Sequence, residues 1–112
     1  MCRTAAELLA GDADLRRIVH LLKAYEPERI ILFGSRARGE MDELSDYDVV
    51  VVKRTEQPFL RRLREVVPYL VKFGRPAEIL VYTPEEFEQM GEAGFGWIIR
   101  NEGVTLYESP SN

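Results

Sequence analysis

Four consecutive valines, Val49 to Val52, constrain the fold of this chain more than any other segment. They follow two aspartates in the stretch "SDYDVVVVK". β-Branched side chains favour strands, and an apolar run that no polar residue interrupts indicates a strand buried on both faces. The sequence therefore predicts a buried strand that other elements of the chain cover.

Apolar spacing and capping patterns predict five helices around this strand. They are "TAAELLAG", a second segment that is capped by Asp12 or Asp14 and ends at Pro27, "FLRRLREVVPYLVKF" with Pro68 kinking or dividing it, "PEEFE" after Thr83, and "WIIRNEG". Short β-branched segments predict three more strands, "RIILF", "AEILVYT" and "VTLYE". The helix after Thr83 is expected to fade at the glycines Gly91, Gly94 and Gly96.

This order of elements implies a small α/β (α+β) sandwich, in which one mixed sheet is flanked by helices that lie mainly on one side. A chain of 112 residues suits a single domain, residues 1–112. The composition, 46% hydrophobic and 30% charged, is that of a globular protein rather than a disordered one.

The cysteine count, the apolar segments and the net charge indicate in which compartment the protein is expected and which partners are not expected. Cys2 is the one cysteine, which excludes an internal disulfide and fits a reducing cytoplasm. No apolar run reaches the roughly 18 residues of a membrane span, and no signal segment opens the chain. With a net charge of −4, direct binding of nucleic acid is not expected. A homo-oligomer and a hetero-oligomer both remain open.

The segment "LFGSRARG" predicts a strand that ends at Gly34-Ser35 and continues into a helical turn. The first amides of such a turn are unpaired and attract anions. Gly34 would let a phosphate approach the backbone closely, and Arg36 or Arg38 could add charge-assisted contacts. Taken alone, the segment could also be a strand-to-helix turn with a serine cap.

Asp46 and Asp48 stand one residue apart at the start of the valine strand. Strand alternation points both side chains to one face, where two like charges are unfavourable unless a cation or a shared proton offsets them. Magnesium is the natural cation, because it prefers carboxylate oxygens and keeps positions for water and phosphates. Alternatively, Asp46 is a turn residue and Asp48 is simply exposed.

A third acid, Glu78, lies at the start of another short strand. Ten residues separate Gly34-Ser35 from Asp46, enough for one helical turn and a return loop. Two neighbouring strands joined in this way would bring the turn beside the carboxylates. The three acids and the turn together predict a site for a metal-bound nucleoside triphosphate.

These residues fit the pattern G-S-x10-D-x-D, and the chain resembles the polymerase-β-like nucleotidyltransferases. "LFGSRARG" and "SDYDVVV" are most similar to the minimal nucleotidyltransferase (MNT) domains, as are "VYTPEEFE" and "IIRNEGVTLYE". The resemblance implies that Gly34 and Ser35 hold the triphosphate of ATP, with Arg36 and Arg38 as helpers.

The resemblance also implies that Asp46 and Asp48 bind magnesium, two ions in all, with Glu78 as the third carboxylate. In the family this third acid helps to activate the attacking hydroxyl, and the metal ions clamp the attacking and leaving oxygens at the α-phosphorus. The family usually has aspartate there, whereas this chain has glutamate. A displacement of about 1 Å can lower a rate roughly 100-fold, so we expect weakened activity.

MNT proteins commonly pair with helical HEPN proteins, and several such pairs are toxins and antitoxins. The resemblance thus implies transfer of AMP from ATP to a tyrosine hydroxyl of a HEPN toxin, which this chain would silence as an antitoxin. A binding module that neutralises the HEPN partner by occlusion, with little catalysis, is the second hypothesis. Transfer to a small molecule such as an aminoglycoside is a weaker third.

Other conspicuous side chains have ordinary interpretations. His20 is expected to be structural or at the surface, because no second zinc ligand is near it in the sequence. The arginines of "RRLR" are expected on the solvent face of an amphipathic helix. Phe95 and Trp97 favour core packing or a lid, with base stacking and a partner contact as alternatives.

Overall fold

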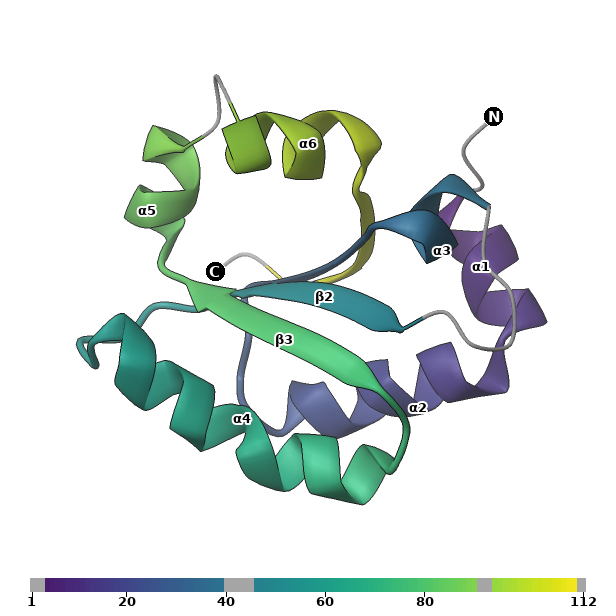
Figure 1. Ribbon diagram of the computed structural model, residues 1–112, viewed down its shortest axis with the longest axis horizontal. Helices are drawn as coiled ribbons and strands as arrows, with labels where there is room; N and C mark the ends of the chain where they lie inside the picture. Colours follow the sequence, from purple (N-terminus) through teal and green to yellow (C-terminus); the bar gives the residue numbers. More distant parts are fainter. Residues whose placement is uncertain (1–3, 40–45, 91–93, 111–112) are drawn as a thin grey trace.

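The computed structural model describes residues 4–39, 46–90 and 94–110. Its elements follow the predicted order (Figure 1). They are α1 (Ala5–Gly11), α2 (Ala13–Lys23), β1 (Arg29–Phe33), α3 (Ser35–Arg38), β2 (Tyr47–Val52), α4 (Phe59–Phe73), β3 (Ala77–Tyr82), α5 (Pro84–Gln89), α6 (Gly94–Glu102) and β4 (Val104–Glu108). The expectations for Cys2, Gly91 and the return loop over 40–45 lie outside the described residues.

The four strands form one mixed sheet in the order β3-β2-β1-β4. β1 pairs antiparallel with β2 and β4, whereas β2 and β3 are parallel. Along β2, Val49 and Val51 belong to the core cluster on one face, and Val50 and Val52 to the cluster on the other. The prediction that the valine strand is buried on both faces is therefore confirmed.

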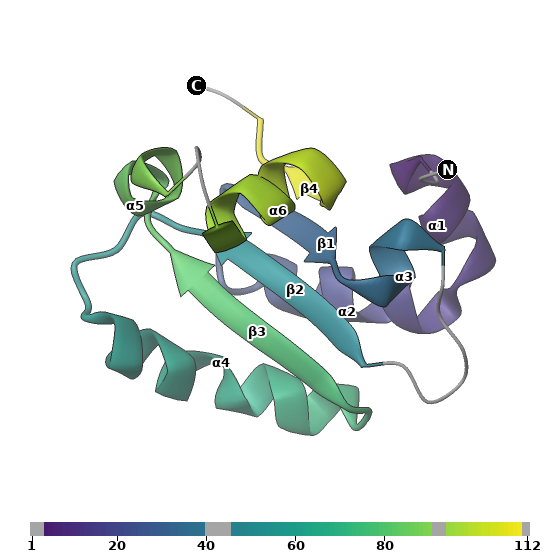
Figure 2. The same cartoon turned by 45° about the horizontal axis from the view of Figure 1, so that its top comes forward.

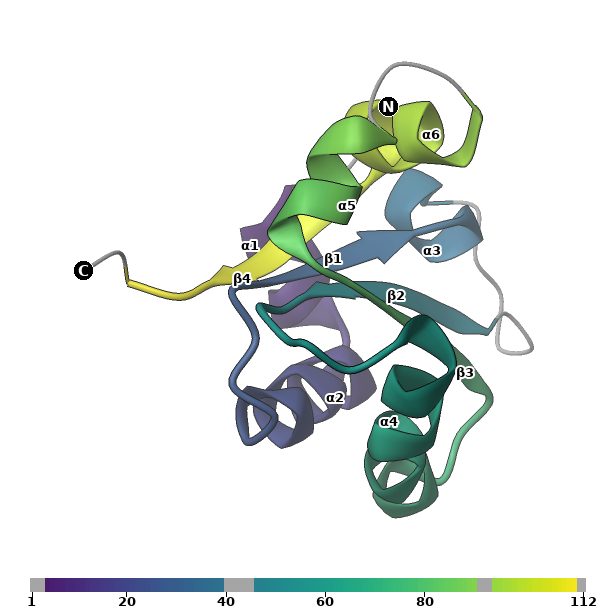
Figure 3. The ribbon, with the colours of Figure 1, turned by 90° about the vertical axis from the view of Figure 1, so that its left-hand side faces the viewer.

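Helices cover both faces of this sheet (Figures 1 and 2). The larger core cluster joins the sheet to α1, α2 and α4, and the smaller one joins it to α5 and α6. Figure 3 shows the sheet between these two layers. The longest helices, α2 and α4, share one side as expected, and the layer of α5 and α6 completes the burial of the valines. Among the described residues, no helix is long and apolar enough to cross a membrane.

The helix ends follow the predicted capping chemistry. Thr4 and Thr83 each start a helix with a capping box, and of the two aspartates considered, Asp12 caps α2. α4 continues as one helix through Pro68, so this proline does not divide it. Pro68 is exposed, and its missing N–H therefore falls on the side of the helix where water can satisfy the freed carbonyl.

The last helix begins earlier than predicted, at Gly94 rather than at Trp97. A Cβ added to Gly96 would lie 1.7 Å from the carbonyl oxygen of Met90. Gly96 is thus required for the close approach of α6 to the end of α5, and it does not act as a helix breaker.

Arg62 corrects the expectation that all three arginines of "RRLR" face solvent. Its side chain is 5% exposed. The guanidinium donates to both carboxylate oxygens of Glu86, at 2.6 and 3.3 Å, and to the carbonyl oxygens of Gln57 and Val81. Arg61 and Arg64 are exposed, as expected. Arg62 therefore joins α4 to β3 and α5, and it holds the pKa of Glu86 below its usual range.

Replacing Arg62 by alanine is expected to lower the free energy of unfolding by about 3 kcal/mol, because Glu86 and two carbonyl groups lose their donor. The matched control is Arg61→Ala, which removes the same charge from the exposed neighbouring position and should change the free energy by less than about 0.5 kcal/mol. Urea denaturation at pH 7 measures both values. Equal losses in the two variants would show that the buried contacts of Arg62 contribute nothing.

The same pair should respond to acid. The lowered pKa of Glu86 means that its stabilisation is present above the ordinary glutamate pKa and is lost as the pH falls through the lowered value. The difference between the native chain and Arg62→Ala should therefore shrink in acid.

Candidate functional site

Strand register brings two of the three predicted acids together. Asp48 on β2 pairs with Phe33, the last residue of β1, and with Glu78 on the parallel strand β3. Directly paired residues project to the same face of a sheet. Asp48 alternates with Val50, which packs with α5 and α6, so these carboxylates belong to that face. Asp46 is exposed just before β2 begins.

The Gly34 turn lies directly against the Asp48 carboxylate. Gly34 has φ +78° and ψ −160°, a conformation that essentially only glycine adopts. A Cβ at this position would be 2.5 Å from Oδ2 of Asp48. The absence of a side chain at Gly34 therefore makes the room that Asp48 occupies.

Ser35 is the first residue of the short helix α3, whose N-terminus has no side-chain cap. The carbonyl oxygen of Gly34 accepts hydrogen bonds from the amides of Ala37 and Arg38, at 3.1 and 3.2 Å. The serine-cap alternative therefore does not describe this turn. What remains is an uncapped helical turn next to a carboxylate, as the sequence predicted.

Asp48 is half-buried, which removes the alternative that it is simply exposed. Burial raises its pKa, and the charges of Glu78 and Asp46 raise it further, while Arg38 lowers it. The ionised form is thus disfavoured unless positive charge comes close. Arg38 is the predicted basic residue whose charge acts on the carboxylates.

Arg36 lies elsewhere. The residue is 7% exposed. The central carbon of its guanidinium lies 3.8 Å from the centroid of the Tyr47 ring, and its Nη1 lies 3.4 Å from Oδ2 of Asp12. Tyr47 belongs to the core cluster with α2 and α4, on the opposite face from Asp48. The structure therefore does not bring the Arg36 guanidinium to the carboxylates.

The contact between Tyr47 and Asp12 escaped the sequence analysis. The Tyr47 hydroxyl donates to the carboxylate of Asp12, at 2.9 Å to Oδ2, and burial followed by this hydrogen bond raises the pKa of Tyr47 to about 12. Asp12 also accepts from the first amides of α2. Together with Arg36, this network fastens α3 and the start of β2 to α2. The sequence carried one indication of this contact: strand alternation in "DYD" points the Tyr47 side chain to the face opposite the acids.

The donor set suits magnesium that is shared with a nucleotide. Across the described ranges, no three or more His, Cys, Asp or Glu side chains gather closely enough to form a complete metal site. Magnesium in nucleotide sites usually takes one or two carboxylates and fills its other positions with phosphate oxygens and water. Asp48 and Asp46 supply carboxylates of this kind, and the Asp48 carboxylate lies against the backbone of Gly34.

Three conspicuous side chains fall outside the carboxylate cluster. Phe95 packs edge-to-face on Phe33, at 5.3 Å between ring centroids, so it is a neighbour of the Asp48 pairing and contacts the core. Trp97 is 49% exposed and is not a core residue. His20 is exposed in the last turn of α2, as predicted.

Comparison with known proteins identifies the family of this chain. The family model of the nucleotidyltransferase domain matches residues 15–101. A protein of Methanocaldococcus jannaschii named "Putative protein adenylyltransferase" is 32% identical over 100 residues, which cover 89% of this chain and 99% of that protein. A second protein of that organism with the same designation is 32% identical over 80 residues, 71% of this chain and 78% of its own length.

Two solved structures share the fold. A toxin-antitoxin crystal structure with AMP-PNP has a TM-score of 0.60 at 18% identity, over 84% of this chain and 73% of the matched chain. A structure described as a "putative nucleotidyltransferase" from Sulfolobus solfataricus has a TM-score of 0.59 at 20% identity, over 96% of this chain and 90% of its own. On the match of its family model and its relatives, the chain belongs to the nucleotidyltransferase domain family and is a nucleotidyltransferase.

Proposed function

We propose that this chain transfers AMP from ATP to a hydroxyl group of a partner protein. The observation that carries the proposal is the register of three adjacent strands: the Gly34 turn ends β1, Asp48 lies beside it on β2, and Glu78 is paired with Asp48 on β3. An anion-binding turn and paired carboxylates thus meet on one face of the sheet.

The triphosphate of ATP is proposed to bind at the uncapped turn of Gly34 and Ser35. A glycine lets a phosphate group approach the backbone, and the first amides of α3, which have no side-chain cap, are proposed to donate to it. Arg38, whose charge acts on Asp48, is proposed to contact the phosphates as well. Arg36 contacts Asp12 and the Tyr47 ring on the opposite face of the sheet, and we propose that it positions the turn.

The transfer itself is an in-line displacement. The acceptor oxygen forms a bond to the α-phosphorus, and the bond from that phosphorus to the oxygen bridging it to the β-phosphorus breaks, so that pyrophosphate leaves. Glu78 is proposed to accept the proton of the acceptor hydroxyl, because it is exposed at the edge of the carboxylate cluster. Magnesium held by Asp46 and Asp48, as two ions in the family's manner, would neutralise the phosphate charge there.

The acceptor is proposed to be a tyrosine of a HEPN-type toxin, with this chain as its antitoxin. Three observations support a protein acceptor: the names of the two archaeal relatives, the toxin-antitoxin complex among the structural neighbours, and the sequence resemblance to MNT domains. The labelling experiment described below tests this acceptor.

Occlusion of the partner without transfer is the second candidate, and Glu78 favours it. This position carries aspartate in most of the family, and the longer side chain displaces the carboxylate by about one methylene. Such a displacement can lower the rate roughly 100-fold while leaving the binding surface intact.

Neutralising Asp48 should stabilise the protein while removing its ligand. Because the pKa of Asp48 is raised in the folded state, its ionised form costs stability at pH 7, and this cost disappears as the pH falls through the raised pKa. Asp48→Asn should therefore raise the melting temperature without nucleotide. In calorimetry, both Asp48→Asn and Asp46→Asn should lose magnesium-dependent ATP binding.

The control for the thermal shift is Asp14→Asn. Hydrogen bonds from Arg75 and Arg17 lower the pKa of Asp14, so this substitution should lower the melting temperature. Shifts of the same sign in the two variants, or undiminished ATP binding in Asp48→Asn, would contradict the proposed role of Asp48.

Gly34→Ala should destabilise the fold by about 2–3 kcal/mol, because its backbone conformation is essentially restricted to glycine and the new Cβ meets Asp48. Gly74→Ala is the comparison, since Gly74 also has a positive φ, +72°, but no atom within 4 Å of the added Cβ. It should cost about 1 kcal/mol. Only Gly34→Ala should weaken ATP binding in calorimetry, and wild-type affinity in that variant would exclude the turn as a phosphate site.

Glu78→Gln separates transfer from occlusion. It keeps the size of the side chain but removes the proton acceptor, so AMP transfer should fall about 100-fold, or roughly 2.7 kcal/mol of transition-state stabilisation, with ATP affinity largely retained. Glu78→Asp restores the usual residue of the family. A gain in rate would indicate a weakened site, and a loss would indicate a site adapted to glutamate.

The measurement is incubation with magnesium and ATP labelled at its α-phosphate in extract of the source cells, followed by mass spectrometry of labelled proteins. Glu56→Gln removes an exposed carboxylate away from the site and should transfer at the native rate. A native chain that binds a helical partner and never labels it would leave occlusion as the function.

A further inference from the structure

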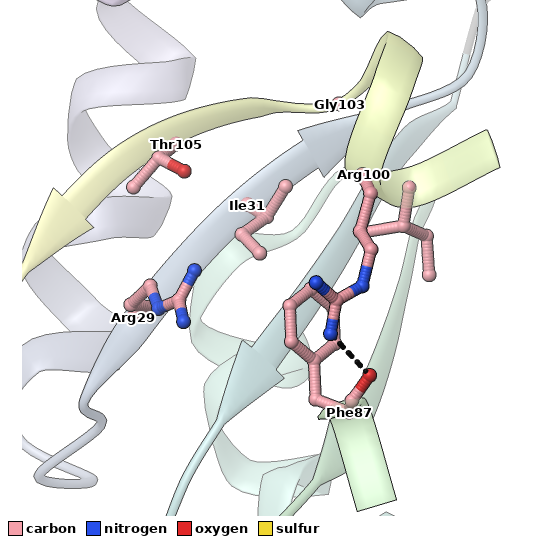
Figure 4. A pocket seen from close by; sticks show the side chains of 7 residues that line it. Arg29, Ile31, Phe87, Arg100, Gly103 and Thr105 are labelled. Carbon is pink, nitrogen blue, oxygen red and sulfur yellow. Dashed lines mark hydrogen bonds between the residues drawn. The ribbon is translucent and has the colours of Figure 1, made fainter. Parts of the chain in front are cut away.

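A pocket of about 240 Å³ lies on the same side of the sheet as α5 and α6, and Gly34 is not among its lining residues. β1, β4, α5 and α6 all contribute to it (Figure 4). Three lining residues are apolar and three are polar: Ile31, Phe87 and Ile99, and Arg29, Arg100 and Thr105. Arg29 and Phe33 share one face of β1 four residues apart, so Arg29 lies about 13 Å along the strand from the Asp48 pairing, with the lining residue Ile31 between them.

Two guanidinium groups are held over one aromatic ring in this pocket. The central carbon of Arg100 lies 4.9 Å from the centroid of the Phe87 ring, and that of Arg29 lies 5.4 Å from the same centroid. Arg100 also donates to the carbonyl oxygen of Phe87 at 2.9 Å, as Figure 4 shows. Both guanidinium groups line the pocket, and the ring partly offsets the repulsion between them.

The carboxylates that pair with these arginines are weak partners. Glu108 lies 4.0 Å from Arg29 and is 70% exposed, and Glu88 lies 3.8 Å from Arg100 and is 74% exposed. Exposed ion pairs at such distances contribute little. A carboxylate that enters the pocket would meet both guanidinium groups, which line it, and can replace these pairs.

We infer that this pocket binds a carboxylate on an aliphatic stem, with the carboxylate between Arg29 and Arg100 and the stem on Ile31 and Ile99. Guanidinium groups match the two oxygens of a carboxylate, and the Thr105 hydroxyl adds a third donor. These three donors suit the two oxygens of a carboxylate better than a phosphate, which needs donors on more sides. The ligand is either an acidic side chain of a partner protein or a free small carboxylate. This site goes beyond the proposed AMP transfer and does not depend on it.

The test is an NMR titration of the full chain, following the side-chain Nε–H signals of Arg29 and Arg100 and the amide of Thr105. The probes are sodium glutarate, a capped alanine peptide with a central glutamate, and the same peptide with glutamine. We expect shifts with glutarate, with the glutamate peptide, or with both, and none with the glutamine peptide. Binding of glutarate alone would identify free carboxylates as the ligand, and binding of the peptide alone would identify a protein side chain.

Variants show whether the pocket itself binds. Arg29→Gln and Arg100→Gln should each weaken the affinity at least tenfold, whereas Arg54→Gln, which removes an exposed arginine paired with Glu28 and Glu85, should not change it. Glu88→Gln and Glu108→Gln should strengthen binding several-fold, because they remove the competing carboxylates. If Arg100→Gln fails to fold, Arg29→Gln carries the test, since its side chain pairs only with exposed Glu108 among the acids recorded for the described residues.

The inference is overturned if none of the probes shifts the pocket signals, or if glutamate and glutamine peptides shift them equally. Equal weakening by Arg54→Gln and Arg29→Gln would also overturn it, because binding would then follow overall charge. ATP binding measured in the same samples should be unchanged in all these variants.

Discussion

The antiparallel pairing of β1 with β2 is the constraint on which the rest of this structure depends. It places Asp48 opposite Phe33, and therefore against the bare backbone of Gly34 that follows. Any side chain at Gly34 would occupy the space of the carboxylate. Pairing of β2 with the parallel strand β3 then sets Glu78 beside Asp48. The turn at Gly34 and the acids thus meet because of strand register, and a shift by one residue would turn Asp48 to the opposite face.

The two sides of the start of β2 have opposite electrostatic character. On the side of α5 and α6, Asp48 is half-buried with Glu78 and Asp46 nearby, an arrangement that raises its pKa. On the side of α2, Tyr47 is buried beneath Arg36 and donates a hydrogen bond to Asp12. The charges of Arg36 and Asp12 therefore both have a partner there. One side is left with excess negative charge that a cation can offset, and the other holds the turn in place. Neighbouring residues of β2 thus have different environments: Asp48 lies among acids, whereas Tyr47 contacts α2 and α3.

Much of the candidate site could be predicted from the sequence, because its residues lie close together along the chain. The spacing of Asp46 and Asp48 needs only strand alternation, and the Gly34 turn needs only a strand followed by glycine and serine. The roles of Arg36 and Arg38 were not separable in this way. Both follow the turn on the same short helix, and only the tertiary structure shows that Arg36 is buried with its guanidinium over the Tyr47 ring. The basic residue near the acids is Arg38.

The sequence by itself determined the order of helices and strands, the burial of Val49 to Val52 on both faces, and the pattern of turn and acids, because periodicity and capping act within a few residues. Tertiary structure alone decided which charges are buried. Arg62 looks like a solvent-facing residue of an amphipathic helix, yet it is enclosed by Glu86 and by the carbonyl groups of Gln57 and Val81. Gly96 looks like a helix breaker, yet it permits α6 to touch Met90. The pocket of Arg29 and Arg100 joins residues from opposite ends of the chain. Long-range packing fixes such contacts, and no local pattern encodes them.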